Sequence, residues 1–382
     1  MAKLRVGVVF GGRSGEHEVS LVSAAAVLAA LDPKRYEVIP IGITREGRWR
    51  LGRSGMLPPT VLAQGTALRL QPQPLAADTP ALRTVESAPP ALRTVDSAPP
   101  ALRAADEHAP RLDVILPILH GPFGEDGSVQ GFFELAGVPY AGSGVLGSAV
   151  AMDKDVMKRL FREAGLPVGP YCRVLRTEWD RHPQAGVRTI ERELRYPLFV
   201  KPANLGSSVG ISKVHNRGEL APAMALASGY DEKVVVEQGI EGRELECAVL
   251  GNDPPLASAL GEIIAGREFY DYDAKYSDAG SRTLVPAPVS ARVAERVRRL
   301  AIRAFQATEC RDLARVDFFL EQGTGKVWLN EINSLPGFTP ISMFPQLWAA
   351  SGVGFSELLD RLIGFALERS RRPAADAASM VK

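Results

Sequence analysis

Two neighbouring strand patterns near the end of the chain predict a β-hairpin. Residues 314–320 and 327–332 are rich in apolar and β-branched side chains, and the Gly-Thr-Gly segment at 323–325 is typical of a tight turn. If Gln322 pairs with Lys326 across this turn, the register of the whole hairpin follows by counting. A slip of one residue would move every side chain to the other face, so this pairing constrains the fold strongly.

The hairpin carries four polar side chains at alternate positions. In the expected register Asp317 lies opposite Glu331 and Arg315 lies opposite Asn333, and all four share one face of the sheet. Any one of them alone would be explained by a solvent-facing strand edge. Carboxylate and amide oxygens, however, are the hard ligands that Mg²⁺ prefers. Together they favour a site for metal-assisted phosphate chemistry.

Composition bounds the class of protein. At 382 residues the chain suits two or three domains, and 46% hydrophobic with 23% charged residues is typical of a soluble protein. A net charge of +1 gives no broad basic surface, so we expect neither nucleic acid nor membrane as a partner. Any bound phosphate must be held by local groups.

Cysteine usage and the apolar segments predict a cytoplasmic protein. Cys172, Cys247 and Cys310 are far apart and show no CxxC spacing, which argues against a disulfide framework or a zinc site. We expect them to be buried small residues. Residues 4–10 are too short for a signal-peptide core, and no apolar run reaches membrane-spanning length.

The first part of the chain predicts an α/β domain. A buried strand at 4–10 leads through glycines to a helix at 21–31 that Ser20 is placed to cap, and further strands are expected at 36–43 and 114–119. A proline-rich repeat interrupts this domain and restarts with Pro-Ala-Leu-Arg at residues 80, 90 and 100. It lacks core-forming periodicity, so we expect an extended or disordered insertion over about 72–110.

The remaining pattern predicts two further units. They comprise helices at 151–164 and 292–307 and strands at 196–201, 211–214, 234–237, 244–250 and 257–264. Lys201 ends one strand, and Gly206-Ser-Ser-Val-Gly210 follows it. Glycines expose backbone N–H groups, hydroxyls donate, and the ammonium supplies charge, so this loop suits phosphate although it is not a Walker A motif. Alone it would be read as a hairpin turn.

Four segments together resemble the D-alanine:D-alanine ligase family. They are residues 10–20 (FGGRSGEHEVS), 120–127 (HGPFGEDG), 200–214 (VKPANLGSSVGISKV) and 330–338 (NEINSLPGF), in the family's order. The resemblance spans about residues 4–365 apart from the proline repeat. It implies an α/β (α+β) fold of three-domain ATP-grasp architecture. We expect an N-terminal α/β domain at 1–141, a central domain at 142–236, a C-terminal domain at 237–370 and a frayed tail at 371–382.

The resemblance also implies where ATP and metal bind, between the central and C-terminal domains. ATP phosphates would be held by Lys154, Lys201 and Ser208, and adenine and ribose by Glu237, Ile240 and Glu244. Lys154 and Glu244 could otherwise be surface charges. Two Mg²⁺ ions, with Mn²⁺ as an alternative, would be bound by Asp317, Glu331 and Asn333.

Substrate residues follow from the same resemblance. Glu16, Ser207 and Tyr276 would act beside the first D-alanine, with His120 near its carboxylate. Arg315 and the Gly337 N–H would stabilise the oxyanion. The second D-alanine would be held by Ser342, Met343, Arg315 and Lys275, and residues 269–276 would form a lid.

The implied activity is ATP-dependent synthesis of D-alanyl-D-alanine through an acyl phosphate, for peptidoglycan precursors, by a homodimer. Two alternatives stay open. One is a ligase for D-lactate or D-serine on the same fold. The other is a nucleotide-binding regulator without turnover, against which the amino-acid ligands Glu16, Arg315 and Ser342 argue.

Overall fold

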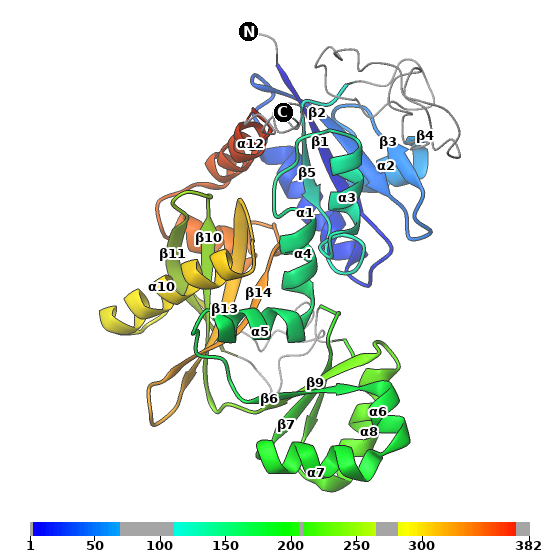
Figure 1. The fold of residues 1–382 in the computed structure, drawn as a ribbon. Coiled ribbons are helices and arrows are strands. Elements are labelled where there is room, and N and C mark those ends of the chain that lie inside the picture. The colour runs from blue at the N-terminus through cyan, green and yellow to red at the C-terminus, as the bar shows by residue number, and fades with distance from the viewer. Residues whose placement is uncertain (1–2, 69–110, 207–208, 265–281, 372–382) are drawn as a thin grey trace, which may run out of the picture.

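The computed structural model describes residues 3–68, 111–206, 209–264 and 282–371, and these form three sheets with flanking helices (Figure 1). The first sheet has the strand order β4-β3-β2-β1-β5. Its strands are β1 (Leu4–Gly11), β2 (Tyr36–Ile43), β3 (Trp49–Leu51), β4 (Thr66–Leu68) and β5 (Val114–Ile118). Strands β2 and β5 both pair with β1 in parallel, and α1 (His17–Ala30), α2 (Pro58–Gln64) and α3 (Ser128–Leu135) accompany this sheet.

The start of α1 differs from the prediction. The helix begins at His17, with Glu16 at its N-cap position, so Ser20 lies inside the helix and does not cap it. The Ser20 hydroxyl accepts the Gly11 N–H at 2.7 Å and donates to the Ile118 carbonyl. A hydroxyl in the first turn can satisfy backbone groups of adjacent strands instead of the helix end, and here it joins β1, β5 and α1.

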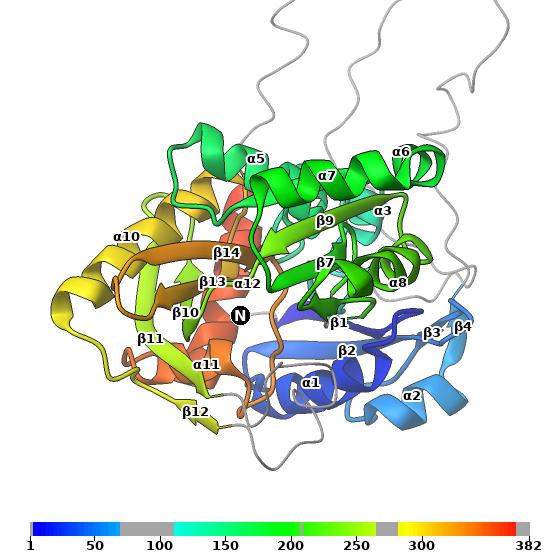
Figure 2. The same ribbon diagram turned by 90° about the horizontal axis from the view of Figure 1, so that it is seen from below.

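The second sheet is antiparallel, with the order β6-β9-β7-β8. It contains β6 (Tyr171–Leu175), β7 (Leu198–Pro202), β8 (Ser212–Val214) and β9 (Lys233–Gln238), and it packs with α6 (Arg176–Arg181), α7 (Pro183–Glu193) and α8 (Arg217–Ser228). Figure 2 shows these helices beside the sheet. Strand β7 starts at Leu198, two residues later than expected, so Tyr196 precedes it.

The third sheet is antiparallel and has the order β12-β11-β10-β13-β14. Its strands are β10 (Gly242–Leu250), β11 (Leu256–Ile264), β12 (Arg282–Leu284), β13 (Leu313–Glu321) and β14 (Val327–Asn333). Helix α10 (Ala291–Ala307) covers one side of it. The helix buries Val297, Ala301 and Phe305 against this sheet.

The β13–β14 hairpin has the predicted polar face, but its register next to the turn differs from the prediction. Near the turn Leu320 pairs with Val327, so the expected pairing of Gln322 with Lys326 is wrong by one residue. A β-bulge at the Asp317–Phe318 step then shifts the register by one. As a result Asp317 lies opposite Glu331 and Arg315 opposite Asn333, as the sequence predicts.

Three main apolar cores hold the described elements together. One core joins the first sheet and α1 to the ends of β10 and β13 and to α11 (Met343–Ala349) and α12 (Phe355–Arg371). A second core packs α10 and α5 (Lys154–Glu163) on the third sheet, and a third lies between the second sheet and its helices. Helix α5 lies between the second and third sheets (Figure 1). Clefts at sheet junctions of this kind are common ligand sites.

Further predictions concern the cysteines, membrane-spanning helices and the segments outside the described residues. All three cysteines are buried and free, as predicted. None of the described helices is both long and apolar enough to cross a bilayer. The proline-rich insertion, the 269–276 lid and the tail beyond 371 lie outside the described residues.

Candidate active site

The polar face of β13 and β14 is a compact set of charged groups. Arg315 donates to both oxygens of Asp317, at 2.8 Å from Nε and 2.7 Å from Nη2. The Asn333 amide also donates to Asp317, at 3.0 Å, which leaves the Asn333 side-chain oxygen as an acceptor for another group. Asp317 is almost fully buried. Glu331 is partly exposed, so the open side of this face belongs to Glu331 and Asn333.

Glu246 on β10 completes this face. It is paired opposite Asp317 in the sheet and lies 3.0 Å from Nε of Arg315. Burial lowers the pKa of Arg315, but the carboxylates of Asp317 and Glu246 outweigh it and raise that pKa well above its usual value. The guanidinium is therefore held between two carboxylates and stays charged.

A buried charge cluster connects the second sheet to α5. Glu237 on β9 accepts from Lys201 of β7 at 3.0 Å and lies 3.3 Å from Nζ of Lys158 on α5. Lys158 also donates to the Asn330 carbonyl of β14 at 2.8 Å. Burial alone would raise the pKa of Glu237, yet the two lysines lower it to about 2. Two lysines thus face one carboxylate here, and Glu331 also acts on both of them.

Lys154 lies at the start of α5, where the structure corrects the prediction of one helix from 151 to 164. Helix α4 (Val145–Met152) ends at Met152, and Asp153 caps α5 by accepting the N–H groups of Asp155 and Val156. The Lys154 side chain is buried and donates to the Leu205 carbonyl, next to the glycine-serine loop. The alternative that Lys154 is a surface charge is therefore wrong.

Glu16 lies where β1, β5 and the glycine-serine loop meet. A methyl group added at Gly121 would lie 2.8 Å from its Oε2, and one added at Gly206 would lie 3.4 Å away. Gly121 has a φ of +72°, a conformation that glycine adopts without strain. The carboxylate of Glu16 is thus directly beside Gly206, the residue before Ser207.

His120 and Glu125 flank the same position. His120 is buried, with Nδ1 3.1 Å from the Leu335 carbonyl and Nε2 3.5 Å from the Ser23 hydroxyl. Burial lowers its pKa although Glu16 acts in the opposite direction, so the ring is neutral at pH 7. Glu125 accepts the Gly121 N–H at 3.0 Å, and burial together with the Glu16 charge raises its pKa to about 8.

The segment after β14 brings the last predicted residues to the same region. Ser342 Oγ accepts the Thr339 N–H at 3.1 Å and lies 2.7 Å from the Thr339 hydroxyl, and a methyl group at Gly337 would lie 3.1 Å from it. Met343 is buried, and its side chain lies against Gly261 of β11.

The other predicted residues have simple placements. Ile240 lies in the turn between β9 and β10 and is half-buried, and Glu244 is half-buried on the face of β10 that carries Glu246. A fully exposed charge at Glu244 is therefore excluded. Ser207, Ser208, Lys275 and Tyr276 lie outside the described residues.

Three charged residues of the site were missed in the sequence, and each had a signal. Lys158 is four residues after Lys154 and so lies on the same helix face. Glu246 is two residues after Glu244 and so lies on the same strand face. Glu125 lies within the segment 120–127, where only His120 was assigned a role.

Fold and site together define the class of protein. Two antiparallel sheets with lysines and carboxylates facing their junction, preceded by an α/β domain, form the ATP-grasp fold. A family model described as the D-ala D-ala ligase N-terminus matches residues 5–143, and one described as its C-terminus matches residues 160–364. The chain belongs to the D-alanine–D-alanine ligase family.

Individual relatives agree with this membership. The chain is 47% identical over 374 residues to a D-alanine–D-alanine ligase of Natranaerobius thermophilus, and the match covers 97% of both proteins. Among solved structures, the D-alanine-D-alanine ligase of Coxiella burnetii is 34% identical with a TM-score of 0.79, covering 97% of this chain and 95% of that one. The VanG D-Ala:D-Ser ligase of Enterococcus faecalis is 34% identical with a TM-score of 0.81, covering 96% and 100%.

The activity follows from this membership. The protein is a ligase that joins D-alanine to D-alanine for peptidoglycan synthesis, and it uses ATP and a divalent metal. The alternative of a D-lactate or D-serine ligase has no support from the curated relatives, which are D-alanine–D-alanine ligases.

Proposed function

We propose that this chain makes D-alanyl-D-alanine through an acyl phosphate, with the residue roles given below. The observation that carries the proposal is the convergence of two sets of charges at one junction. Lys158 of α5 contacts both Glu237 of β9 and the backbone of β14, next to Glu331. A cationic group that suits phosphate therefore adjoins a carboxylate face that suits metal.

ATP would lie between the second and third sheets. Lys201 and Lys154, with Ser208, would bind its phosphates. Lys158 would add a further positive charge beside them. Glu237, Ile240 and Glu244 would hold adenine and ribose. The two neighbouring ammonium groups of Lys158 and Lys201 support this assignment, because both can donate to phosphate oxygens.

The residues present fit a Mg²⁺ site. Mg²⁺ usually takes one or two protein carboxylates and completes its shell with water and substrate phosphates. Asp317 and Glu331 would supply the carboxylates, and the Asn333 amide points its nitrogen at Asp317, which leaves its oxygen available. When bound, two Mg²⁺ ions, or Mn²⁺, would offset charge on the phosphate that is transferred.

The chain's own groups would direct the reaction of D-alanine. Glu16 would pair with the ammonium of the first D-alanine and neutral His120 would lie beside its carboxylate, which attacks the γ-phosphorus of ATP. ADP leaves and an acyl phosphate forms. The amine of the second D-alanine, held by Ser342, Met343, Lys275 and Arg315, then attacks the acyl carbon, and phosphate leaves.

Two further groups of residues serve this second step. Arg315 and the Gly337 N–H would donate to the tetrahedral oxyanion, and one such donor is worth roughly 3 kcal/mol. The acyl phosphate is open to hydrolysis, so the 269–276 lid would exclude water, with Tyr276 and Ser207 beside Glu16.

The proposal extends to location, assembly and domain limits. A cytoplasmic location is supported by three free buried cysteines. We also propose a homodimer, as the family resemblance implies. We place the domains at 1–141, 142–236 and 237–370.

The metal assignment is tested by Glu331→Gln. The substitution keeps the shape and removes a negative charge, so we expect kcat to fall by on the order of 100-fold and the Mg²⁺ concentration for half-maximal rate to rise. Glu295→Gln, at an exposed glutamate of α10, is the control and should behave as the wild type. Normal turnover of Glu331→Gln at saturating Mg²⁺ would refute the assignment.

A further inference from the structure

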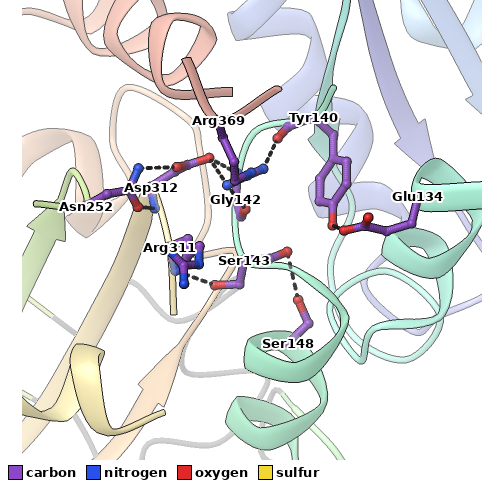
Figure 3. A network of polar contacts seen from close by, with 9 residues as sticks. All are labelled: Glu134, Tyr140, Gly142, Ser143, Ser148, Asn252, Arg311, Asp312 and Arg369. Carbon is purple, nitrogen blue, oxygen red and sulfur yellow. Dashed lines mark hydrogen bonds and ion pairs between the residues drawn. The ribbon is translucent and has the colours of Figure 1, made fainter. Parts of the chain in front are cut away.

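A buried polar network outside the catalytic face joins four distant parts of the chain (Figure 3). Its centre is Asp312, which directly precedes β13 and has no exposed side-chain surface. Its Oδ2 accepts the Gly142 N–H at 2.9 Å and Nη1 of Arg369 at 3.0 Å, and its Oδ1 accepts the Asn252 amide at 2.8 Å. Every partner comes from a different element.

Arg369 on α12 binds more than the carboxylate. Its guanidinium also donates to the Gly142 carbonyl at 3.2 Å and to the Tyr140 carbonyl, and it lies over the Tyr140 ring (Figure 3). Gly142 is therefore held by both backbone groups, its N–H by Asp312 and its carbonyl by Arg369. The planar guanidinium of arginine has several N–H donors in fixed directions, so it can bond to three acceptors at once. The compact ammonium of lysine does not match this arrangement.

The network connects on one side to the segment before His120 and on the other side to β13. On one side, residues 139–141 flank β5, with the Ile115 N–H donating to the Pro139 carbonyl at 2.8 Å. Strand β5 ends two residues before His120. On the other side, Asp312 leads into β13, which carries Arg315 and Asp317.

Apolar packing at this junction is extensive but does not set orientation. One continuous core joins the first sheet, Leu313, Leu335 and α12. Hydrophobic contacts are non-directional, whereas hydrogen bonds fix angles and distances. The network therefore supplies directional contacts between the first sheet and β13, beside others at this junction such as the Tyr36 hydroxyl to Asp360 and the Phe338 N–H to Ser23.

We propose that Arg369 is a positioning residue that sets the D-alanine half of the site, Glu16 and His120, against Arg315 on β13. This inference rests on the residue roles proposed above. Arg369 lies beyond residue 364, where the match to the family model ends. The described groups assigned to ATP lie on α5, β7, β9 and β10 and in the turn between β9 and β10, whereas the hydrogen bonds of Arg369 go to Tyr140, Gly142 and Asp312. Loss of Arg369 therefore impairs the use of D-alanine and spares nucleotide binding.

The test compares Arg369→Gln with Arg361→Gln. Arg361 is on the same helix and pairs with Glu357, one turn away on the surface. For Arg369→Gln we expect KM for D-alanine to rise about tenfold and the Kd for ADP, measured by calorimetry, to stay within about twofold, since small misplacements of reacting groups are costly. Arg361→Gln should leave both unchanged.

Two results would overturn the inference. The first is an unchanged KM for D-alanine in folded Arg369→Gln. The second is an equal loss of D-alanine use and ADP binding, which indicates general loss of folded protein. Should Arg369→Gln fail to fold, Arg369→Lys carries the same test, because it keeps the charge beside Asp312 but cannot reach both carbonyls. A rise of about threefold in KM for D-alanine then supports the inference, and no rise overturns it.

Glu16→Gln, measured in parallel, separates this inference from the roles on which it rests. If Glu16→Gln leaves KM for D-alanine unchanged, the proposed D-alanine site is wrong. If it raises KM while Arg369→Gln does not, the site is right and the positioning role of Arg369 is wrong.

Discussion

Replacing Glu125 with glutamine should change how stability depends on pH. Glu125 accepts the Gly121 N–H at 3.0 Å, and a glutamine can accept the same bond through its side-chain oxygen. Burial and the carboxylate of Glu16 raise the pKa of Glu125 to about 8, while Lys154 and Arg315 act in the opposite direction. Glu125 therefore keeps its proton at neutral pH in the folded protein, whereas the unfolded chain loses it near pH 4.5.

The sign and size of the effect follow from this difference. Between about pH 4.5 and about pH 8 the folded state binds one more proton than the unfolded state, so folded stability falls as pH rises. At pH 7 the solution is about 2.5 units above the pKa of Glu125 in the unfolded chain. This corresponds to a loss of about 3 kcal/mol in the free energy of unfolding. Because Glu125 is only half-buried, water screens part of the effect, and we expect about 2 kcal/mol.

The assay is urea unfolding of wild type and Glu125→Gln at a series of pH values from about 4.5 to about 8.5. The difference between the two proteins removes the titration of all other groups. We expect Glu125→Gln to gain stability relative to wild type by about 2 kcal/mol from pH 4.5 to pH 7, and then to level off above pH 8. A difference that is flat over this range would refute the raised pKa and the proximity of the two carboxylates.

Two further substitutions test the charge clusters. Glu246→Gln removes one of the two carboxylates that hold Arg315, so we expect kcat to fall about tenfold while ADP binding without metal is unchanged; an unaltered kcat would show that Asp317 alone positions Arg315. Glu237→Gln leaves two lysines without their carboxylate. Because the folded pKa of Glu237 is about 2, its contribution of about 3 kcal/mol is present above about pH 4.5 and lost as pH falls toward 2, so the stability difference from wild type should shrink in that range.

Much of the site was predictable because strand periodicity and pairing are local rules. Residues 36–43 were predicted as a strand and form β2, and the face with Asp317 and Glu331 was predicted correctly. The pairing next to the turn was wrong, and a bulge compensated for the error. Bulges depend on packing from the neighbouring strand, which alternation in one segment does not reveal.

The rest of the site depends on contacts between distant segments. Ser20 resembles a helix cap in the sequence, but its hydroxyl joins β1 to β5, over ninety residues away. The network at Asp312 is also invisible in the sequence, because Gly142, Asn252 and Arg369 are each 57 residues or more from Asp312. Pairings of this range follow from tertiary packing and not from local pattern.

The most direct test of the central claim is identification of the product by mass. Wild-type protein is incubated with ATP, Mg²⁺ and D-alanine, with D-lactate and D-serine present as competitors. The account predicts D-alanyl-D-alanine as the main product, with ADP and phosphate released in equal amounts and only when D-alanine is present. Phosphate release without dipeptide, or a main product ending in D-lactate or D-serine, would contradict it.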